Sequence, residues 1–335
     1  MNTPLVSICV PTYNRPEFLR RAVESCLAQT YPHFEVIITD NSTNDDTAKL
    51  AANWTDPRLR YFKNQGNIGA VASSNRAVSL SSGQYIKFLM DDDLLKPRCL
   101  ERMVQALEAN PTAGIAMAPM ELIDESDQRI FPRFYVFRKM QTRYRYQVGD
   151  GLIDRRQILR DFLTRDYPCT VPSGLMFRAE ALRRAGQFRE EADFAGDLEM
   201  CMRIAPEWDF YYIDEILSSW RFMPVCHTAS LHQTGLKISV FYNLTRACLA
   251  NPHVRECFKD DWKKTVRDSL FFCSCRALLN ILAGLRTRSP KLIFSTVKSI
   301  LCEDPDPVNW LRLPLFIARQ IWVSLWPRTL PPPRE

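Results

Sequence analysis

Three consecutive aspartates, Asp91, Asp92 and Asp93, directly follow the largely apolar run Tyr85–Met90. A short run of β-branched and aromatic residues is typical of a buried strand. The carboxylates are therefore expected at the carboxyl end of a strand, where open α/β sheets bind ligands. At about 5 Å and an effective dielectric near 20, two such charges repel by roughly 3 kcal/mol. A divalent cation would remove this repulsion, and oxygen ligands suit Mg²⁺ or Mn²⁺. A solvated acidic loop is the alternative interpretation.

Segments with strand and helix patterns alternate ahead of these aspartates. Strands are predicted over 5–10, 35–39, 59–62 and 85–90, and helices over 17–28 and 70–80. This alternation predicts an α/β fold with a mostly parallel sheet flanked by helices. Polar side chains follow each predicted strand: Thr12 and Asn14, Asp40 and Asn41, Asn64 and Asn67, and the three aspartates.

Several motifs occur in order along about the first 230 residues. The first four are Val6–Arg15, Thr39–Thr47, Asn64–Gly69 followed by Ser74–Ala77, and the aspartate run. Together they resemble the motifs of the family-2 glycosyltransferases of the GT-A fold, and an ordered set is more specific than any single motif. The resemblance implies a Rossmann-like sheet. It also implies an inverting transfer of a sugar from a nucleotide-diphosphate donor to an acceptor hydroxyl.

The same resemblance implies where the donor, interpreted as a UDP-sugar, would bind. Asp40 ends the second predicted strand and is expected to accept hydrogen bonds from the base or the ribose. Arg221 is expected to contact the phosphates, because its guanidinium group suits them. The full set of implied donor-binding residues is Pro11, Thr12, Tyr13, Asn14, Asp40, Asn67, Asn75, Asp91 and Arg221.

The implied metal ligands are Asp92, Asp93 and His227, and the implied ion is Mn²⁺ or Mg²⁺. The family pattern is Phe-Leu-Asp-x-Asp-Asp, and Met90 stands where its first aspartate would be. Either Asp91 and Asp93 form the DxD pair, or Asp92 binds the metal with support from a neighbour. The segment around His227 resembles the closing loop of the family, where a neutral imidazole ligates the metal or caps the site. A purely structural or exposed histidine is the alternative.

A catalytic base is predicted on the helix-like segment Phe194–Ile204. Its first turn carries Asp197 and Glu199, and simple capping of a helix N-terminus would explain both. The segment also resembles the Glu-Asp-Trp-Asp helix of the family, with Asp197 at the catalytic aspartate, although Gly196 and Leu198 replace the Glu and the Trp. Direct displacement at an anomeric carbon needs a base for the incoming hydroxyl and no protein nucleophile. Asp197 is the predicted base.

The acceptor and two rival functions follow from the same motifs. Gly174 and Glu199 are implied on the acceptor side, and a glycan or lipid-linked glycan is the implied acceptor, as in surface-polysaccharide assembly. A nucleotidyltransferase would need a phosphate loop rich in glycine and lysine near the N-terminus, and Pro11–Arg15 lacks one. A catalytically inactive scaffold that binds a nucleotide sugar is favoured by Met90 and Gly196.

Residues 1–232 are predicted to form the catalytic domain, and residues 233–335 a C-terminal helical region. Residues 236–335 hold 16 Lys and Arg against 8 Asp and Glu, a net charge of +8, whereas the whole chain carries +6. Trp310, Trp322 and Trp326 lie there among arginines and apolar runs, which favours peripheral contact with an anionic membrane over nucleic acid. A helical bundle packed on the catalytic domain or on a second subunit is the alternative. No apolar run reaches the length of about 20 residues that a membrane span requires.

Cysteine usage and the N-terminus predict a cellular compartment. The 11 cysteines show no paired framework, which is typical of free thiols in a reducing environment. The first four residues lead directly into the first predicted strand, so no signal peptide is expected. Together these features predict a cytoplasmic protein, peripheral on the inner face of the plasma membrane if the C-terminal region binds lipid.

Overall fold

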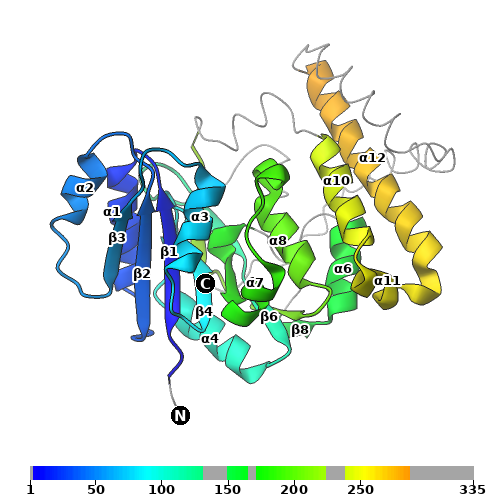
Figure 1. Ribbon diagram of the computed structural model, residues 1–335, viewed down its shortest axis with the longest axis horizontal. Helices are drawn as coiled ribbons and strands as arrows, with labels where there is room; N and C mark the ends of the chain where they lie inside the picture. The colour runs from blue at the N-terminus through cyan, green and yellow to red at the C-terminus, as the bar shows by residue number, and fades with distance from the viewer. Residues whose placement is uncertain (1–2, 131–148, 165–170, 224–237, 287–335) are drawn as a thin grey trace.

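The computed structural model describes residues 3–130, 149–164, 171–223 and 238–286 (Figure 1). Figure 1 shows an α/β body that contains the N-terminal two thirds of the chain, and a group of helices from the C-terminal third beside it. The described ranges therefore cover most of the predicted catalytic domain and the first part of the predicted C-terminal region.

The central sheet has eight strands in the order β3-β2-β1-β4-β9-β6-β10-β8. Its first half, β3, β2, β1 and β4, is parallel, as predicted. Strand β9 runs antiparallel to both β4 and β6, β10 runs parallel to β6, and β8 closes the far edge antiparallel to β10. The α/β prediction is confirmed. The strands are β1 Val6–Thr12, β2 Phe34–Asp40, β3 Leu59–Lys63, β4 Tyr85–Phe88, β6 Ala113–Met117, β8 Gly151–Ile153, β9 Leu175–Arg178 and β10 Asp209–Tyr212.

Helices cover both faces of this sheet. Successive residues of a strand point to opposite faces, and in β1 Ile8 and Val10 join one buried cluster while Cys9 joins the other. Burial on both sides explains why the inner strands are continuous apolar runs and do not alternate with polar residues. The helices of this body are α1 Pro16–Leu27, α2 Asp46–Ala51, α3 Ala70–Ser79, α4 Cys99–Ala109, α6 Arg155–Thr164, α7 Ala179–Ala185 and α8 Gly196–Ile204, with 3₁₀ turns η1 Pro172–Gly174 and η2 Glu190–Ala195.

Strand β4 is two residues shorter than the predicted strand. It ends at Phe88, and the amide of Asp93 donates to the carbonyl of Met90 at 3.0 Å, so the chain turns at Met90. The aspartates therefore form a turn that leaves the sheet. The strand that follows the turn, β5 Leu94–Leu95, belongs to a second sheet of three strands in the order β5-β11-β7. Its other strands are β7 Met120–Ile123 and β11 Ser218–Arg221.

The described part of the C-terminal region packs on the catalytic body. Helix α10 Ile238–Leu249 contacts α8 and α12 Trp262–Arg286, and α12 also contacts α6. Phe241 of α10 is buried in the same cluster as Met200 of α8. Between them, α11 Pro252–Cys257 and η3 Lys259–Asp261 complete the described helices. The predicted boundary at 232 lies outside the described residues. One hydrophobic core contains residues from both sides of it, such as Tyr212 and Phe241.

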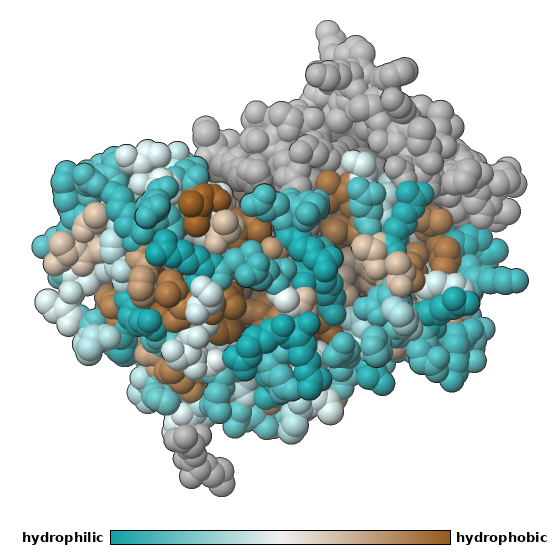
Figure 2. Space-filling view, viewed as in Figure 1, coloured by the Kyte–Doolittle hydropathy of each residue, from teal (hydrophilic) through white to brown (hydrophobic). Residues whose placement is uncertain are grey.

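The visible surface carries few extended apolar areas. Most of the face seen in Figure 2 is hydrophilic, and apolar side chains reach it in separate groups. Among the helices of the described ranges, none is long and apolar enough to cross a membrane. The predicted membrane-contact tryptophans, Trp310, Trp322 and Trp326, lie outside the described residues.

Candidate active site

The predicted polar segments meet at the carboxyl edge of the parallel strands. In the sheet, β1 lies between β2 and β4, and Thr12 pairs in register with Asp40. The hydroxyl of Thr12 donates to Asp91 Oδ2 at 2.8 Å, and the amide of Tyr13 donates to the same oxygen at 3.3 Å. Burial is the largest cause that raises the pKa of Asp91 to about 6, and the neighbouring Asp92 charge adds to it. Asp91 therefore ties the end of β1 to the acidic turn.

Asp92 is the most accessible carboxylate of the triplet. Its Oδ2 lies 2.6 Å from Nη1 of Arg15, and the two side chains are 16% and 35% exposed. The same Arg15 nitrogen lies 3.5 Å from Asp91 Oδ1. Arg15 was not among the predicted site residues. Its only sequence signal is its position as the last residue of the first motif, Val6–Arg15, which does not reveal that β1 and β4 are neighbours.

Asp93 points into the protein and is only 1% exposed. Its Oδ2 accepts from the Ser173 hydroxyl at 2.5 Å, and its Oδ1 accepts from the Arg221 amide at 2.9 Å. Burial, followed by the Asp92 charge, raises the pKa of Asp93 to about 8. Ser173 Oγ also accepts from the Met90 amide at 3.1 Å. Asp93 and Ser173 thus fix the turn that presents Asp92.

We expect Ser173→Ala to lower the free energy of unfolding by about 1–3 kcal/mol, because Asp93 and the Met90 amide would both lose a buried partner. Urea unfolding at constant pH measures this loss. Ser79→Ala is the matched control, since Ser79 is an exposed serine of α3, and it should change stability by less than about 0.5 kcal/mol. Equal losses in the two variants would show that Ser173 does not support the turn.

Arg221 is buried beneath the acidic turn. Its Nε donates to the backbone carbonyl of Asp92 at 2.7 Å, and its two terminal nitrogens donate to the Asp124 carbonyl and to the Asp127 carboxylate. The Cζ atom of Arg221 lies 5.0 Å from the centroid of the Phe18 ring. The predicted phosphate contact by Arg221 would require these bonds to break. In the structure described here, Arg221 supports the turn from below.

The loop after β2 is fixed in a similar way. Asp40 is fully buried, and its two oxygens accept from the Ser42 amide at 2.7 Å and from the Tyr61 hydroxyl at 2.6 Å. Because the side chain is fully buried, a base or ribose could reach it only if the surrounding loop moved. Asn14, which adopts φ 52°, is bonded to the same loop. Its backbone N–H donates to Ser42 Oγ at 2.8 Å, and its side-chain Oδ1 accepts from the backbone N–H of Thr43 at 3.0 Å.

Two predicted residues, one in β1 and one just after it, differ in their accessibility. Pro11 pairs in register with Thr39 inside the sheet. Tyr13 is 44% exposed at the end of the strand. An exposed aromatic ring at this edge offers a flat apolar surface with a polar tip, which suits stacking on a nucleotide base.

The loop that precedes α3 is held against the ends of β2 and β3. Asn41 Nδ2 donates to the Gly69 carbonyl at 3.0 Å, and Asn64 Nδ2 donates to Asn41 Oδ1 at 2.7 Å. Asn67 is exposed, and its Oδ1 accepts from the Gly69 amide at 3.0 Å. Gly69 has φ 88°, a conformation that favours glycine, at the residue before α3. Asn41 and Asn64 are thus buried supports, and Asn67 is the accessible residue.

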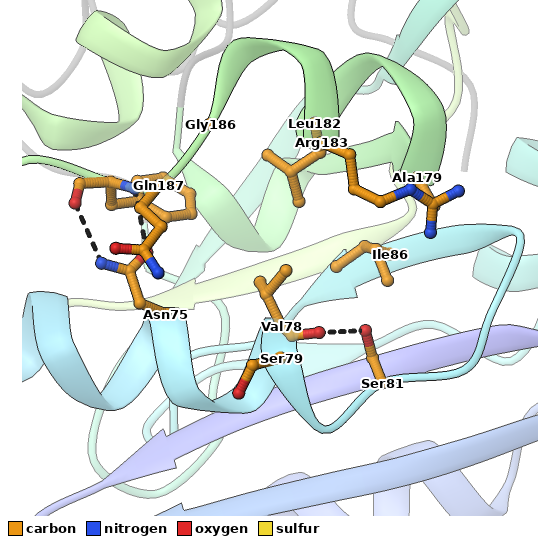
Figure 3. Close-up of a pocket in the computed structure, with 11 residues that line it drawn as sticks. Asn75, Val78, Ser79, Ser81, Ile86, Ala179, Leu182, Arg183, Gly186 and Gln187 are labelled. Carbon is orange, nitrogen blue, oxygen red and sulfur yellow. Dashed lines mark hydrogen bonds between the residues drawn. The ribbon is translucent and has the colours of Figure 1, made fainter.

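Asn75 connects α3 to the segment that leads into α8. Its Nδ2 donates to the Phe188 carbonyl at 2.9 Å, and its Oδ1 accepts from the Phe188 amide at 2.9 Å. A cavity of about 340 Å³ lies beside this link, between α3 and α7 (Figure 3). Apolar side chains such as Val78 and Leu182 line much of it, and none of its lining residues is acidic. The cavity is therefore distinct from the acidic turn.

The two acids of α8 have different surroundings. Asp197 is half-buried, and its Oδ1 accepts from the Leu198 amide at 2.8 Å. Loss of solvent around the carboxyl raises its pKa to about 7. Glu199 is 6% exposed and lies 2.7 Å from Arg203 Nε and 3.4 Å from Arg189. Asp197 can therefore exchange a proton near neutral pH, whereas Glu199 is engaged in an ion-pair cluster.

Of the two remaining predicted residues, Gly174 has a structural role and His227 is not described. Gly174 is buried, and its carbonyl accepts from the Ala118 amide at 3.1 Å. A Cβ at this position would lie 3.2 Å from the Ala118 carbonyl oxygen, so close packing accounts for the glycine. His227 lies outside the described residues.

The acidic turn fits a metal ion that shares its ligands with a substrate. Within residues 3–130, 149–164, 171–223 and 238–286, no three His, Cys, Asp or Glu side chains converge as a complete metal-binding cluster. Mg²⁺ is commonly held by one or two carboxylates together with substrate phosphates and water. Asp91 and Asp92 provide two carboxylates that already attract one cation, the Arg15 guanidinium. Asp93 is turned away from that position.

Comparison with known proteins gives a consistent result. The family model described as Glycosyl transferase family 2 matches residues 7–186. The glycosyltransferase MJ1057 of Methanocaldococcus jannaschii, itself uncharacterized, is 28% identical over 229 residues, which are 66% of this chain and 72% of that protein.

Two solved structures show the same fold. Staphylococcus aureus TarS 1–349 in complex with UDP-GlcNAc has a TM-score of 0.58 at 14% identity, over 88% of this chain and 90% of that one. The mannosyltransferase PcManGT from Pyrobaculum calidifontis, in complex with GDP-Man and Mn²⁺, has a TM-score of 0.58 at 17% identity, over 98% of this chain and 89% of that one. These similarities confirm the predicted GT-A fold. Since the family model matches more than half of the chain, this protein belongs to glycosyl transferase family 2 and is a glycosyltransferase.

Proposed function

We propose that this glycosyltransferase transfers a sugar from a nucleotide-diphosphate sugar to an acceptor hydroxyl, with inversion, by direct displacement assisted by a divalent cation. The observation that carries the proposal is the carboxylate pair Asp91 and Asp92 at the end of β4, beside the end of β1. The titles of the neighbouring structures, which name UDP-GlcNAc, GDP-Man and Mn²⁺, support a nucleotide-sugar donor.

Asp92 is the residue proposed to hold Mn²⁺ or Mg²⁺, with Asp91 beside it. When bound, the ion would neutralise the charge that develops on the leaving diphosphate. Asp93 is reassigned in this proposal from metal ligand to support, because it is only 1% exposed and both of its oxygens accept hydrogen bonds inside the protein. Tyr13 and Asn67 are the accessible residues proposed to contact the donor, while Asp40 and Arg221 hold the loops that form its site.

Asp197 is proposed to remove the proton from the acceptor hydroxyl. A general base works best when its pKa lies near the operating pH, and the pKa of Asp197 is raised to about 7 by burial. The attacking hydroxyl then reaches the anomeric carbon from the side opposite the diphosphate, and the anomeric configuration inverts. A glycan or a lipid-linked glycan remains the proposed acceptor, with Glu199 holding the α8 region through Arg203.

Peripheral membrane contact stays a prediction. It rests on the net charge of +8 in residues 236–335. In the described part of that region, apolar residues of α10 such as Val240 and Leu244 are buried against the catalytic body. The lipid contact proposed for residues 233–335 would therefore use side chains other than these.

Thermal stabilisation by a panel of nucleotide sugars, with and without Mn²⁺, tests donor binding. A ligand at 100 times its Kd stabilises the folded state by about 2.7 kcal/mol. We expect one diphosphate sugar to raise the melting temperature by several degrees, and more strongly with Mn²⁺.

Product analysis separates the rival functions. Proton NMR of the product should show the anomeric configuration opposite to that of the donor, and retention would refute the mechanism. An inactive scaffold would be stabilised by the donor without releasing any nucleotide. A nucleotidyltransferase would instead release pyrophosphate from a nucleoside triphosphate and a sugar phosphate.

A further inference from the structure

We propose that Arg15 is a built-in counter-ion of the acidic turn, which a divalent cation displaces and which the donor diphosphate then binds. The inference rests on the proposed function, because it concerns the same carboxylates. It adds a residue that would make the binding of the metal and the binding of the donor cooperative. Its starting point is the 2.6 Å contact between Arg15 Nη1 and Asp92 Oδ2.

Arg15 is the exposed cation at this site, and Arg221 is the buried one. The side chain of Arg221 is fully buried, and it donates to the Asp92 carbonyl and to the Asp127 carboxylate. The side chain of Arg15 is 35% exposed. In the described residues its contacts with acids are those to Asp91 and Asp92. Arg15 can therefore leave the carboxylates without breaking buried bonds in the core.

A metal ion and Arg15 would compete for the same carboxylates. Asp92 and Asp91 are the residues that would hold the metal, and Arg15 Nη1 lies 2.6 Å from Asp92 Oδ2 and 3.5 Å from Asp91 Oδ1. Two cations in that space would repel each other. Metal binding in the absence of donor must therefore displace Arg15, which weakens the affinity for the metal.

The donor gives the displaced guanidinium a new partner. Arg15 directly precedes α1, a helix of 12 residues, and follows the exposed Tyr13 at the end of β1. The guanidinium group is a planar donor that matches the geometry of phosphate, and the helix N-terminus adds positive potential at the same place. Arg15 is thus a positioning residue that opposes the metal alone and favours the metal with a diphosphate.

Mn²⁺ binding to the full chain tests this inference directly. The electron paramagnetic resonance signal of free Mn²⁺ gives the affinity without a turnover assay. We expect Arg15→Gln to bind Mn²⁺ alone about five-fold more tightly, which corresponds to about 1 kcal/mol. With Mn²⁺ present, the same variant should bind UDP or GDP about five-fold more weakly. The cooperativity between nucleotide and metal should therefore decrease, as linkage requires.

Two further variants control for charge and folding. Arg20→Gln removes the same charge from α1, but Arg20 pairs with Glu17 and Glu24, so its Mn²⁺ affinity should stay within about two-fold of wild type. Arg15→Lys keeps the charge and should suppress Mn²⁺ binding as the wild type does. Unchanged melting temperatures in all three variants would show that they fold.

The outcomes distinguish this inference from the proposed function. If Arg15→Gln and Arg20→Gln bind Mn²⁺ with equal affinity, the counter-ion role is wrong while the metal site stands. If no variant binds Mn²⁺ even with UDP or GDP, the metal site and the counter-ion role are both wrong.

Discussion

Asp92→Asn should reduce the transfer rate by about 1,000-fold. Loss of a metal ligand removes several kcal/mol of transition-state charge stabilisation, and each 1.36 kcal/mol is a factor of ten. Asparagine has nearly the same size, and the buried supports of the turn, Asp93 and Ser173, do not depend on the Asp92 side chain. The fold should therefore persist. Steady-state rates with saturating donor and Mn²⁺ provide the measurement.

Asp56→Asn is the matched control for this prediction. Asp56 also pairs with an arginine, Arg58, at 2.8 Å, but it precedes β3 at the opposite end of the parallel strands. Its transfer rate should stay within about two-fold of wild type. Full activity of Asp92→Asn, or full activity of the wild type in excess chelator, would exclude metal-assisted transfer at this turn.

Asp197→Asn should lower the transfer rate by about 100-fold or more, because asparagine cannot accept the proton of the acceptor hydroxyl. In the wild type, kcat/KM should rise as the pH increases through about 7, since the pKa of Asp197 is raised to about 7 and only its ionised form is a base. The variant should lose this pH dependence. Measuring kcat/KM from pH 5.5 to 8.5 shows both effects.

The stability of Asp197→Asn and the behaviour of a Glu199 variant distinguish a catalytic base at Asp197 from a helix cap. A raised folded-state pKa means that the protonated carboxyl is favoured in the folded protein, so the contribution of Asp197 to stability falls as the pH rises toward 7. Neutral asparagine should therefore not destabilise the protein at pH 8. Glu199→Gln should lower stability by weakening the pairs with Arg203 and Arg189, yet keep the pH dependence of the rate. Near wild-type transfer by Asp197→Asn would mean that Asp197 is only a cap.

Much of the fold follows from local sequence patterns. The apolar runs and helical periodicities predicted the first four strands, helices α1 and α3, and the position of the aspartates beyond β4. These features depend on residues close together in the chain, because period and composition set secondary structure locally. Strand β4 ends two residues earlier than predicted, and the turn that follows at Met90 is held by a contact with Ser173, which lies 83 residues away in the sequence.

The division of roles among the site residues depends on long-range packing. Sequence alone left open which of Asp91, Asp92 and Asp93 is available to a ligand. In the structure, Thr12 from β1 binds Asp91, and Ser173 and Arg221 bind Asp93. Asp92 is therefore the most accessible carboxylate, and it makes the shorter of the two contacts with Arg15.

The sequence by itself determined that the chain forms an α/β sheet with acids at a strand end and an acidic helix start near residue 197, because these are properties of short segments. Only the tertiary structure decided that Asp40 and Arg221 are buried supports, that Arg15 reaches the acidic turn, and that burial raises the pKa of Asp197 to about 7. The physical reason is that exposure, charge pairing and desolvation depend on which segments become neighbours in space. That neighbourhood is set by strand order, which no local pattern specifies.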